Sequence, residues 1–234
     1  MEQKVFLITG TSRGIGRELC EFYLKQGHLV AGCSRNSSDL KHDGYSHFSF
    51  DVSDEKAVKH MVRETIKKYG RIDVLLNNAG IASMNPVILT PYKTAVNIFN
   101  TNFFGTFLFL REAGKAMIRQ KKGRIVNFST VATPLRLEGE AIYAASKASV
   151  VSLTEIAARE LAPYFITVNA VGPTPTPTDL IKSVPSDKMD LLINQQAIKR
   201  LGTIQDITNV INFFIADQSD FVTGQTIYLG GVNS

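Results

Sequence analysis

Short apolar runs rich in β-branched residues alternate along the chain with longer segments in which apolar residues recur every three to four positions. The short runs are typical of buried strands, and they fall at 4–9, 29–33, 72–76, 124–128, 166–170 and 226–229. The longer segments predict helices at 14–26, 53–69, 96–119, 143–161 and 204–216. Ser53 is the predicted cap of the second helix. This alternation predicts an α/β fold with a doubly wound parallel sheet and helices on both faces.

Nothing in the sequence divides the chain. No repeat, low-complexity stretch or Ser/Gly-rich linker interrupts the 234 residues. An α/β unit often reaches about 250 residues as one domain. We therefore expect a single domain over residues 1–234, with ligands bound at the carboxyl ends of the strands.

Composition and charge exclude several classes of protein. Hydrophobic residues make up 44% and charged residues 20%, as in an ordinary globular protein and unlike a disordered chain. The net charge of +5 is spread along the chain, so we expect no nucleic-acid partner. Apolar runs fall far short of the roughly 20 residues of a membrane span, so we expect no membrane partner. Cys20 and Cys33 have no metal-ligand spacing, which predicts no metal site and favours reduced thiols in the cytoplasm.

A glycine-rich turn, Thr9 to Gly16, follows the first predicted strand and opens the first helix. Gly10 permits a tight turn, Gly14 allows a pyrophosphate to approach the backbone, and Gly16 allows the helix to pack close to the sheet. The free amides and the dipole of the helix N-terminus favour phosphate there. A purely structural turn is the alternative, which the position after the first strand disfavours.

A proline-rich segment breaks the alternation. Residues 172–178 read GPTPTPT, which predicts an extended loop, and residues 179–197 are weakly helical. Long irregular connections in compact domains are usually functional. We predict a substrate lid at about 179–200.

Several further motifs occur in a fixed order: Asp51-Val52, Asn77-Asn78-Ala79-Gly80, Asn102, Tyr143-x-x-x-Lys147, Val168-Asn169-Ala170 and Phe221-x-Thr223-Gly224-Gln225. Together with the turn at Thr9 to Gly16, they make the chain resemble the short-chain dehydrogenase/reductase family over nearly its whole length. The resemblance is to ketoreductases of the acyl-carrier-protein reductase and tropinone reductase kind. It implies a Rossmann fold, a nicotinamide cofactor, and hydride transfer between a carbonyl and an alcohol.

The resemblance also assigns roles to residues. The catalytic set is Asn102, Thr130, Tyr143 and Lys147. The cofactor-binding set is Gly10, Ser12, Arg13, Gly14, Ile15, Gly16, Ser34, Arg35, Asp51, Val52, Asn78, Ala79, Gly80, Tyr143, Lys147, Pro173, Thr176 and Thr178. For Asp51, whose implied role is to bind adenine, a helix cap is the alternative.

Tyr143 and Lys147 are four positions apart, on one face of a helix. A free phenol has a pKa near 10. An ammonium about 4 Å away is worth roughly 4 kcal/mol at an effective dielectric of 20, or about three pKa units as an upper guide. We therefore expect Lys147 to lower the pKa of the Tyr143 phenol toward neutrality.

The end of the second strand predicts which cofactor binds. An acidic residue there would accept from a ribose diol and repel a 2′-phosphate. This chain has Ser34 where the family's NAD-dependent members have Asp, followed by Arg35, while Arg13 lies in the turn. Two guanidiniums favour a phosphate, so we predict NADP(H).

Two departures from the family pattern concern the substrate. The family has a serine thirteen positions before the tyrosine; here that position is Thr130, and Ser129 is one residue away. Threonine keeps the hydroxyl, so we assign Thr130 to the carbonyl oxygen. The glycine that the family has after Pro173 is absent. The resemblance gives the Thr176 backbone and the Thr178 hydroxyl to the cofactor, and it gives Asn102 a role in a proton relay.

These inferences predict an NADP(H)-dependent ketoreductase that acts on a small-molecule carbonyl or alcohol. One alternative is a catalytically inactive dinucleotide-binding or sensing protein of the same fold, and another is a structural subunit of a reductase complex. The resemblance implies a homotetramer or homodimer paired through the long helices and the last strand. Arg136, Glu138 and Glu140 lie between Thr130 and Tyr143, and we interpret them as surface charges rather than substrate contacts. The substrate itself is not indicated.

Overall fold

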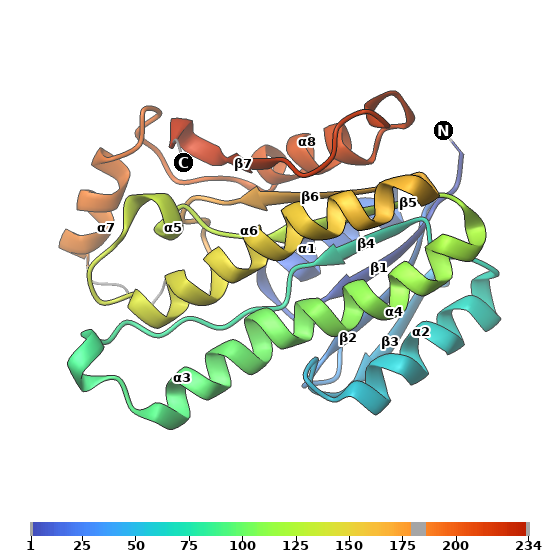
Figure 1. The fold of residues 1–234 in the computed structure, drawn as a ribbon, viewed down its shortest axis with the longest axis horizontal. Coiled ribbons are helices and arrows are strands. Elements are labelled where there is room, and N and C mark those ends of the chain that lie inside the picture. Colours follow the sequence, from blue (N-terminus) through green and yellow to red (C-terminus); the bar gives the residue numbers. More distant parts are fainter. Residues whose placement is uncertain (1, 179–185, 233–234) are drawn as a thin grey trace.

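The computed structural model describes residues 2–178 and 186–232, and within them seven parallel strands form one sheet. The strand order is β3-β2-β1-β4-β5-β6-β7. The strands are β1 Val5–Thr9, β2 Leu29–Ser34, β3 Tyr45–Ser49, β4 Val74–Asn77, β5 Gly123–Phe128, β6 Ile166–Gly172 and β7 Thr226–Tyr228. The order reverses between β1 and β4, which leaves a crevice at their carboxyl ends. The predicted doubly wound α/β fold is therefore confirmed (Figure 1).

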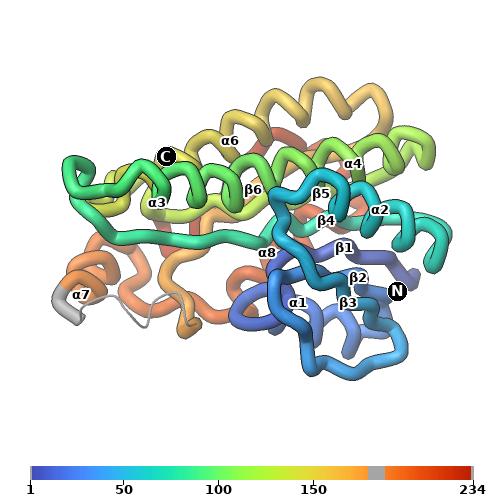
Figure 2. The backbone as a smooth tube through the Cα atoms, turned by 90° about the horizontal axis from the view of Figure 1, so that it is seen from below, coloured from blue at the N-terminus to red at the C-terminus, as the bar shows by residue number. Residues whose placement is uncertain are grey.

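Helices cover both faces of this sheet (Figure 2). Helices α2, α4 and α6 pack on the face where Leu7 and Leu75 point, and α1 and α8 pack on the face of Phe6 and Ile8. The helices are α1 Gly14–Lys25, α2 Glu55–Tyr69, α3 Tyr92–Phe99, α4 Gly105–Gln120, α5 Ala132–Leu135, α6 Ala141–Leu161, α7 Ser186–Asn194 and α8 Ile204–Ile215. Because both faces are buried, the strands are apolar throughout, as the sequence pattern predicts. None of the helices in the described ranges is apolar over enough length to cross a membrane.

Two predicted helices differ from the structure. The segment 96–119 is not one helix, because a π-helical turn at Asn100–Phe104 separates α3 from α4. This turn carries Asn102 into the interior, where its amide is fully buried and hydrogen-bonded. Helix α2 begins one residue later than predicted. Its cap is Asp54 rather than Ser53, and the Asp54 side chain accepts from the amides of residues 56 and 57.

Candidate active site

The glycine-rich turn has the backbone that the sequence analysis predicts. Gly10 and Gly14 have φ values of +77° and +56°, a region that favours glycine. A Cβ on Gly16 would come within 2.2 Å of the Gly10 carbonyl oxygen, so no other residue fits there. Arg13, the N-cap residue of α1, contributes no side-chain capping bond. Helix α1 thus begins without a capping side chain at its N-cap position, and the N-terminus of a helix favours an anionic group.

The end of β4 is fastened to the end of β1. The side-chain amide of Asn78 donates to the Thr9 carbonyl at 2.9 Å, and the Ala79 amide donates to Thr9 Oγ1 at 2.9 Å. A Cβ on Gly10 would come within 2.9 Å of Asn78 Nδ2. These contacts make a close-fitting cradle from backbone and small side chains, as binding of a dinucleotide diphosphate requires.

A cavity of about 910 Å³ extends from this cradle to α6 and α7. At one end it is lined by Ser34, Arg35 and Asp51, and the turn residue Arg13 also faces it. Asp51 Oδ1 accepts from the amide and hydroxyl of Ser53, at 2.9 and 2.8 Å. The alternative reading of Asp51 as the helix cap is thus wrong, because Asp54 has that role.

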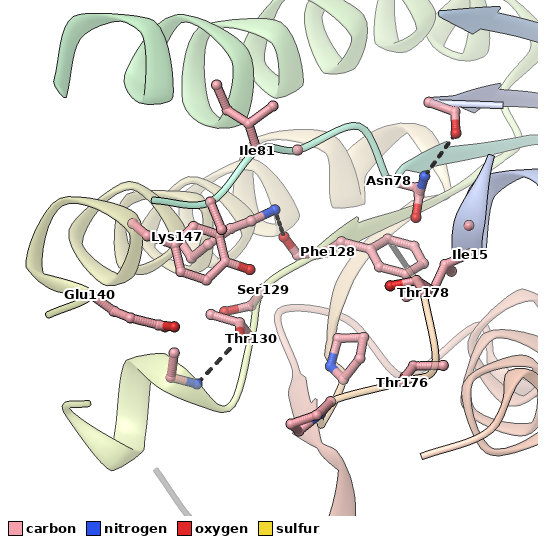
Figure 3. A pocket seen from close by; sticks show the side chains of 18 of the residues that line it. Ile15, Asn78, Ile81, Phe128, Ser129, Thr130, Glu140, Lys147, Thr176 and Thr178 are labelled. Carbon is pink, nitrogen blue, oxygen red and sulfur yellow. Dashed lines mark hydrogen bonds between the residues drawn. The ribbon is translucent and has the colours of Figure 1, made fainter. Parts of the chain in front are cut away.

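Three of the four predicted catalytic side chains, Thr130, Tyr143 and Lys147, line the other end of the same cavity, whereas Asn102 is not among the described residues that line it (Figure 3). Tyr143 and Lys147 come from the first turns of α6, whereas Ser129 and Thr130 follow the end of β5. All four line the cavity and are largely buried: Tyr143 and Thr130 are each 9% exposed, and Lys147 is 3% exposed. The topology therefore brings the helix motif and the strand-end hydroxyls into one site.

The expected lowering of the Tyr143 pKa is not found. Burial raises the pKa of this phenol to about 12, and only a hydrogen bond from Thr130 acts in the lowering direction. Lys147 does not offset the burial, because its ammonium donates to the Phe128 carbonyl at 2.7 Å and burial lowers its own pKa to about 8. At neutral pH the phenol in this site therefore carries its proton.

Asn102 lies close to Lys147, and its side-chain amide binds the backbone of Ile81 and the Ser146 hydroxyl. Its Oδ1 accepts from the Ile81 amide at 2.8 Å, and its Nδ2 donates to the Ile81 carbonyl and to Ser146 Oγ, each at 2.9 Å. A Cβ on Gly80 would be 3.4 Å from both Asn102 Oδ1 and Lys147 Nζ. The structure thus shows a positioning contact for Asn102, and its relay role stays a prediction.

Thr130, rather than Ser129, interacts with the phenol. Its Oγ1 accepts from the Ala132 amide at 3.3 Å, and its contact with Tyr143 stabilises the ionised phenol. Ser129 also lines the cavity, and its backbone amide belongs to the sheet, where it donates to the Val171 carbonyl at 2.8 Å. The contact with Tyr143 favours Thr130, and the choice between the two hydroxyls stays a prediction.

The proline-rich segment lines the cavity and ends beside the phosphate turn. The Pro173 carbonyl accepts from the Val131 amide at 3.3 Å, and Thr176 Oγ1 donates to the Thr174 carbonyl at 3.1 Å. A Cβ on Gly14 would lie 3.5 Å from the Thr178 side chain, and Figure 3 shows Thr178 beside Ile15. Thr178 is therefore placed beside the phosphate turn.

Arg136 and Glu138 are exposed, as interpreted, whereas Glu140 is half-buried, and all three line the cavity. Figure 3 shows Glu140 reaching toward Thr130, and burial raises the pKa of its carboxyl. The predicted lid falls partly outside the described residues, since 179–185 are not described. In the described part, α7 lines the cavity with residues that sequence reasoning missed, and no motif marks them: Lys188, Met189, Leu191 and Leu192.

This arrangement defines an oxidoreductase of the nucleotide-binding α/β class, with a phosphate cradle and a proton-carrying phenol in one cavity. A family model described as enoyl-(acyl carrier protein) reductase matches residues 10–233. The 3-oxoacyl-[acyl-carrier-protein] reductase FabG of Staphylococcus epidermidis is 35% identical over 97% of this chain and 98% of that protein.

Solved structures agree with that match. "ElxO with NADP Bound" has a TM-score of 0.89 and 32% identity, covering 98% of both chains. The ligand-free aldohexose dehydrogenase of Thermoplasma acidophilum has a TM-score of 0.89 and 29% identity, covering 99% of this chain and 94% of that one. The chain belongs to the short-chain dehydrogenase/reductase family, and it is an enzyme that acts on the C=O/CH–OH pair.

Proposed function

We propose that this protein is an NADP(H)-dependent ketoreductase in which Tyr143 is the proton donor. The observation that carries the proposal is one cavity lined at one end by the phosphate turn and at the other by Tyr143, Lys147 and Thr130. Relatives named as FabG and a neighbour solved with NADP support the same chemistry.

The residues at the cradle fit a dinucleotide. The diphosphate would be held by Gly10 and Gly14, which have positive φ, and by the start of α1. Thr178 lies beside Gly14. Lys147 and the Asn78-Ala79-Gly80 segment would hold the nicotinamide ribose. When bound, NADPH supplies a hydride to the carbonyl carbon of the substrate.

The chain's own groups act on the carbonyl oxygen. The Thr130 hydroxyl donates a hydrogen bond to that oxygen and orients it, and Tyr143 gives it the phenolic proton. Because burial raises the pKa of Tyr143 to about 12, the phenol holds at neutral pH the proton that it gives to this oxygen. Lys147, in its charged form and released from the Phe128 carbonyl, would stabilise the phenolate that remains.

The end of β2 favours NADP(H) over NAD(H). Ser34 and Arg35 line the cavity there together with Arg13, and Ser34 replaces the carboxylate that would repel a 2′-phosphate. Arginine forms charge-assisted bonds with phosphate.

The test is NADPH consumption by the purified protein with a panel of carbonyl compounds. The panel includes 3-oxoacyl thioesters, which match the name of the FabG relatives, together with simple ketones and aldehydes. Saturable turnover with at least one compound is expected. Tight NADPH binding without turnover on the whole panel would instead favour the inactive, nucleotide-sensing alternative.

The domain arrangement and the assembly also belong to this proposal. Residues 1–234 form one NADP-binding domain, and the segment at about 179–200 acts as the substrate lid. Exposed apolar side chains support a homodimer or homotetramer: Phe104 is 47% exposed, Ile156 on α6 is 55% exposed, and Phe221 is 99% exposed. Light scattering after size-exclusion chromatography tests this, since a monomer would contradict it.

A further inference from the structure

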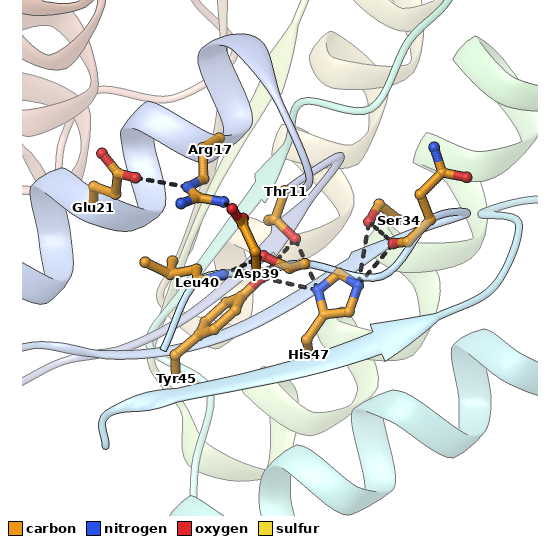
Figure 4. A network of polar contacts seen from close by, with 10 residues as sticks. Thr11, Arg17, Glu21, Ser34, Asp39, Leu40, Tyr45 and His47 are labelled. Carbon is orange, nitrogen blue, oxygen red and sulfur yellow. Dashed lines mark hydrogen bonds and ion pairs between the residues drawn. The ribbon is translucent and has the colours of Figure 1, made fainter. Parts of the chain in front are cut away.

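Behind the adenosine end of the cavity, polar side chains join three segments of the chain (Figure 4). Thr11 comes from the phosphate turn, Ser34 ends β2, and Tyr45 and His47 belong to β3. The Tyr45 hydroxyl lies 2.9 Å from both Thr11 Oγ1 and His47 Nδ1. The other ring nitrogen, His47 Nε2, lies 3.0 Å from the Asn36 carbonyl oxygen and 3.3 Å from Ser34 Oγ.

The partners determine which nitrogen of His47 carries hydrogen. A carbonyl oxygen only accepts, so Nε2 donates to Asn36. In the neutral ring Nδ1 is then an acceptor, and two hydroxyls lie within its reach, Tyr45 at 2.9 Å and Thr11 at 3.4 Å. His47 therefore bridges two segments: Tyr45 and Thr11 on one side, and the backbone that follows Ser34 on the other.

This bridge is part of the joint between the phosphate turn and β2. The amides of Gly10 and Thr11 donate to the Cys33 carbonyl at 2.8 and 3.0 Å. A Cβ on Gly32 would come within 2.6 Å of Thr11 Oγ1 and 2.7 Å of the Tyr45 hydroxyl. Thr11 is fully buried, so the Thr11–Tyr45 contact depends on the absence of a side chain at position 32.

Two donors share the Asn36 carbonyl, and this has a consequence for Ser34. The Ser34 hydroxyl donates to that carbonyl at 2.7 Å, and His47 donates to it as well. When the Ser34 hydroxyl turns toward a phosphate in the cavity, His47 still pairs the carbonyl. The backbone beside Arg35 thus keeps its position while the hydroxyl changes partner.

We propose that His47 is a positioning residue for the 2′-phosphate of NADP(H), and this rests on the cofactor named in the proposed function. It lies behind Ser34, outside the set of described side chains that line the cavity. By holding the segment 34–36 against Thr11 and Tyr45, it keeps Ser34 and Arg35 at the adenosine end. It therefore contributes to the preference for NADP(H) without touching the reacting atoms.

The test measures the dissociation constants of NADPH and of NADH, using nicotinamide fluorescence to detect binding. It compares four variants, three at position 47 and one at position 60. His47→Phe should weaken NADPH about tenfold and NADH less than about twofold, since only the phosphate contact depends on the bridge. His47→Asn, which keeps an acceptor near Tyr45 but does not reach Asn36, should weaken NADPH nearly as much. His47→Gln, whose amide can replace Nε2, should retain the preference within about threefold. His60→Gln, on the exposed surface of α2, is the matched control and should change neither constant.

Equal weakening of both cofactors by His47→Phe would overturn the proposal, because a general structural role predicts that outcome. So would unchanged binding, or a His47→Gln variant no better than His47→Asn. If His47→Phe does not fold, the Gln and Asn variants decide the question alone. The dissociation constants are measured without turnover, so they test His47 independently of the reaction. If the unmodified protein binds NADPH selectively but reduces no carbonyl, the proposed reaction is refuted and the result for His47 still holds. An unmodified protein without preference for NADPH would overturn both.

Discussion

The two ends of the cavity differ in how the chain holds them. At the cofactor end, backbone and short side chains bond across strands, as Asn78 and Ala79 do to Thr9. At the substrate end, the wall consists of the segment 131–140 and of α7, which contribute long side chains such as Arg136 and Lys188. Arg136 has a positive φ of +51°, and Lys188 contacts Met84 through its ammonium at 3.7 Å from the sulfur.

Because of this difference, one end of the cavity determines how the cofactor binds and the other end determines which substrate is selected. A diphosphate requires close approach to backbone, which only glycines and strand ends provide, so the cofactor end is narrowly specified. The substrate end needs only suitable shape and polarity, which many side chains can supply. Substitutions at the first end should therefore change cofactor affinity, and substitutions at the second should change turnover with the cofactor still bound.

Lys147 should show the largest effect among the variants that follow. Lys147→Met removes the charge that stabilises the phenolate, so kcat should fall by about 10²- to 10³-fold. Steady-state kinetics of carbonyl reduction measures this. In the unmodified enzyme, kcat/KM should fall as pH rises through about 8, where Lys147 loses its proton, and the Met variant should lack that decline. A rise in kcat/KM over the same pH range would contradict this role of Lys147.

Thr130 and Ser129 provide a matched pair at the substrate end. Thr130→Ala removes the hydroxyl that contacts Tyr143, so kcat should fall by about 100-fold, as for other lost donors to a carbonyl oxygen. Ser129→Ala should stay within about threefold of the unmodified enzyme. Kinetics of the two variants side by side checks the assignment, and the reverse order would transfer the role to Ser129.

Arg35 tests the cofactor end. Arg35→Asp exchanges a cation for an anion beside the 2′-phosphate position, so the ratio of kcat/KM for NADPH to that for NADH should fall by about 30-fold. The maximal rate with saturating cofactor should remain near normal, because the substituted side chain lies far from Tyr143 along the cavity. An unchanged ratio would show that Arg35 does not contact the phosphate.

Gly14 and Gly70 separate cofactor binding from backbone strain. Both have positive φ, at +56° and +80°, so Gly14→Ala and Gly70→Ala should each cost about 1 kcal/mol of stability. Gly14 lines the cavity and Gly70 does not, and the methyl group added at Gly14 would lie 3.5 Å from the Thr178 side chain and narrow the space beside the turn, so only Gly14→Ala should weaken NADPH, by about tenfold. Thermal unfolding and cofactor titration give the two readouts, and equal weakening by both variants would refute the cradle.

The sequence predicts the cofactor end better than the substrate end, and the reason is physical. Gly10, Gly14 and Gly16 are required by backbone geometry, so their spacing alone indicates the turn. Tyr143 and Lys147 share a helix face, which their spacing also reveals. The π-helical turn at Asn102 is not visible in the sequence, because it depends on the amide bonds to Ile81.

The electrostatics and the substrate wall depend on tertiary structure. Burial of Tyr143 and the turn of the Lys147 ammonium toward Phe128 reverse the pKa change that spacing alone predicts. The contacts of His47 could not be predicted from the sequence, because its partners come from three segments that only the fold brings together. Sequence alone indicates that Glu140 is a surface charge, because only the folded position of the segment 131–140 brings it into the cavity wall.

The most direct test of the account is the substitution Tyr143→Phe, measured by NADPH consumption and by NADPH binding on the same preparation. Removing the phenolic proton should lower kcat by at least about 100-fold while the dissociation constant of NADPH stays within about twofold. Turnover close to that of the unmodified enzyme, with the cofactor bound equally well, would contradict the assignment of Tyr143 as the proton donor.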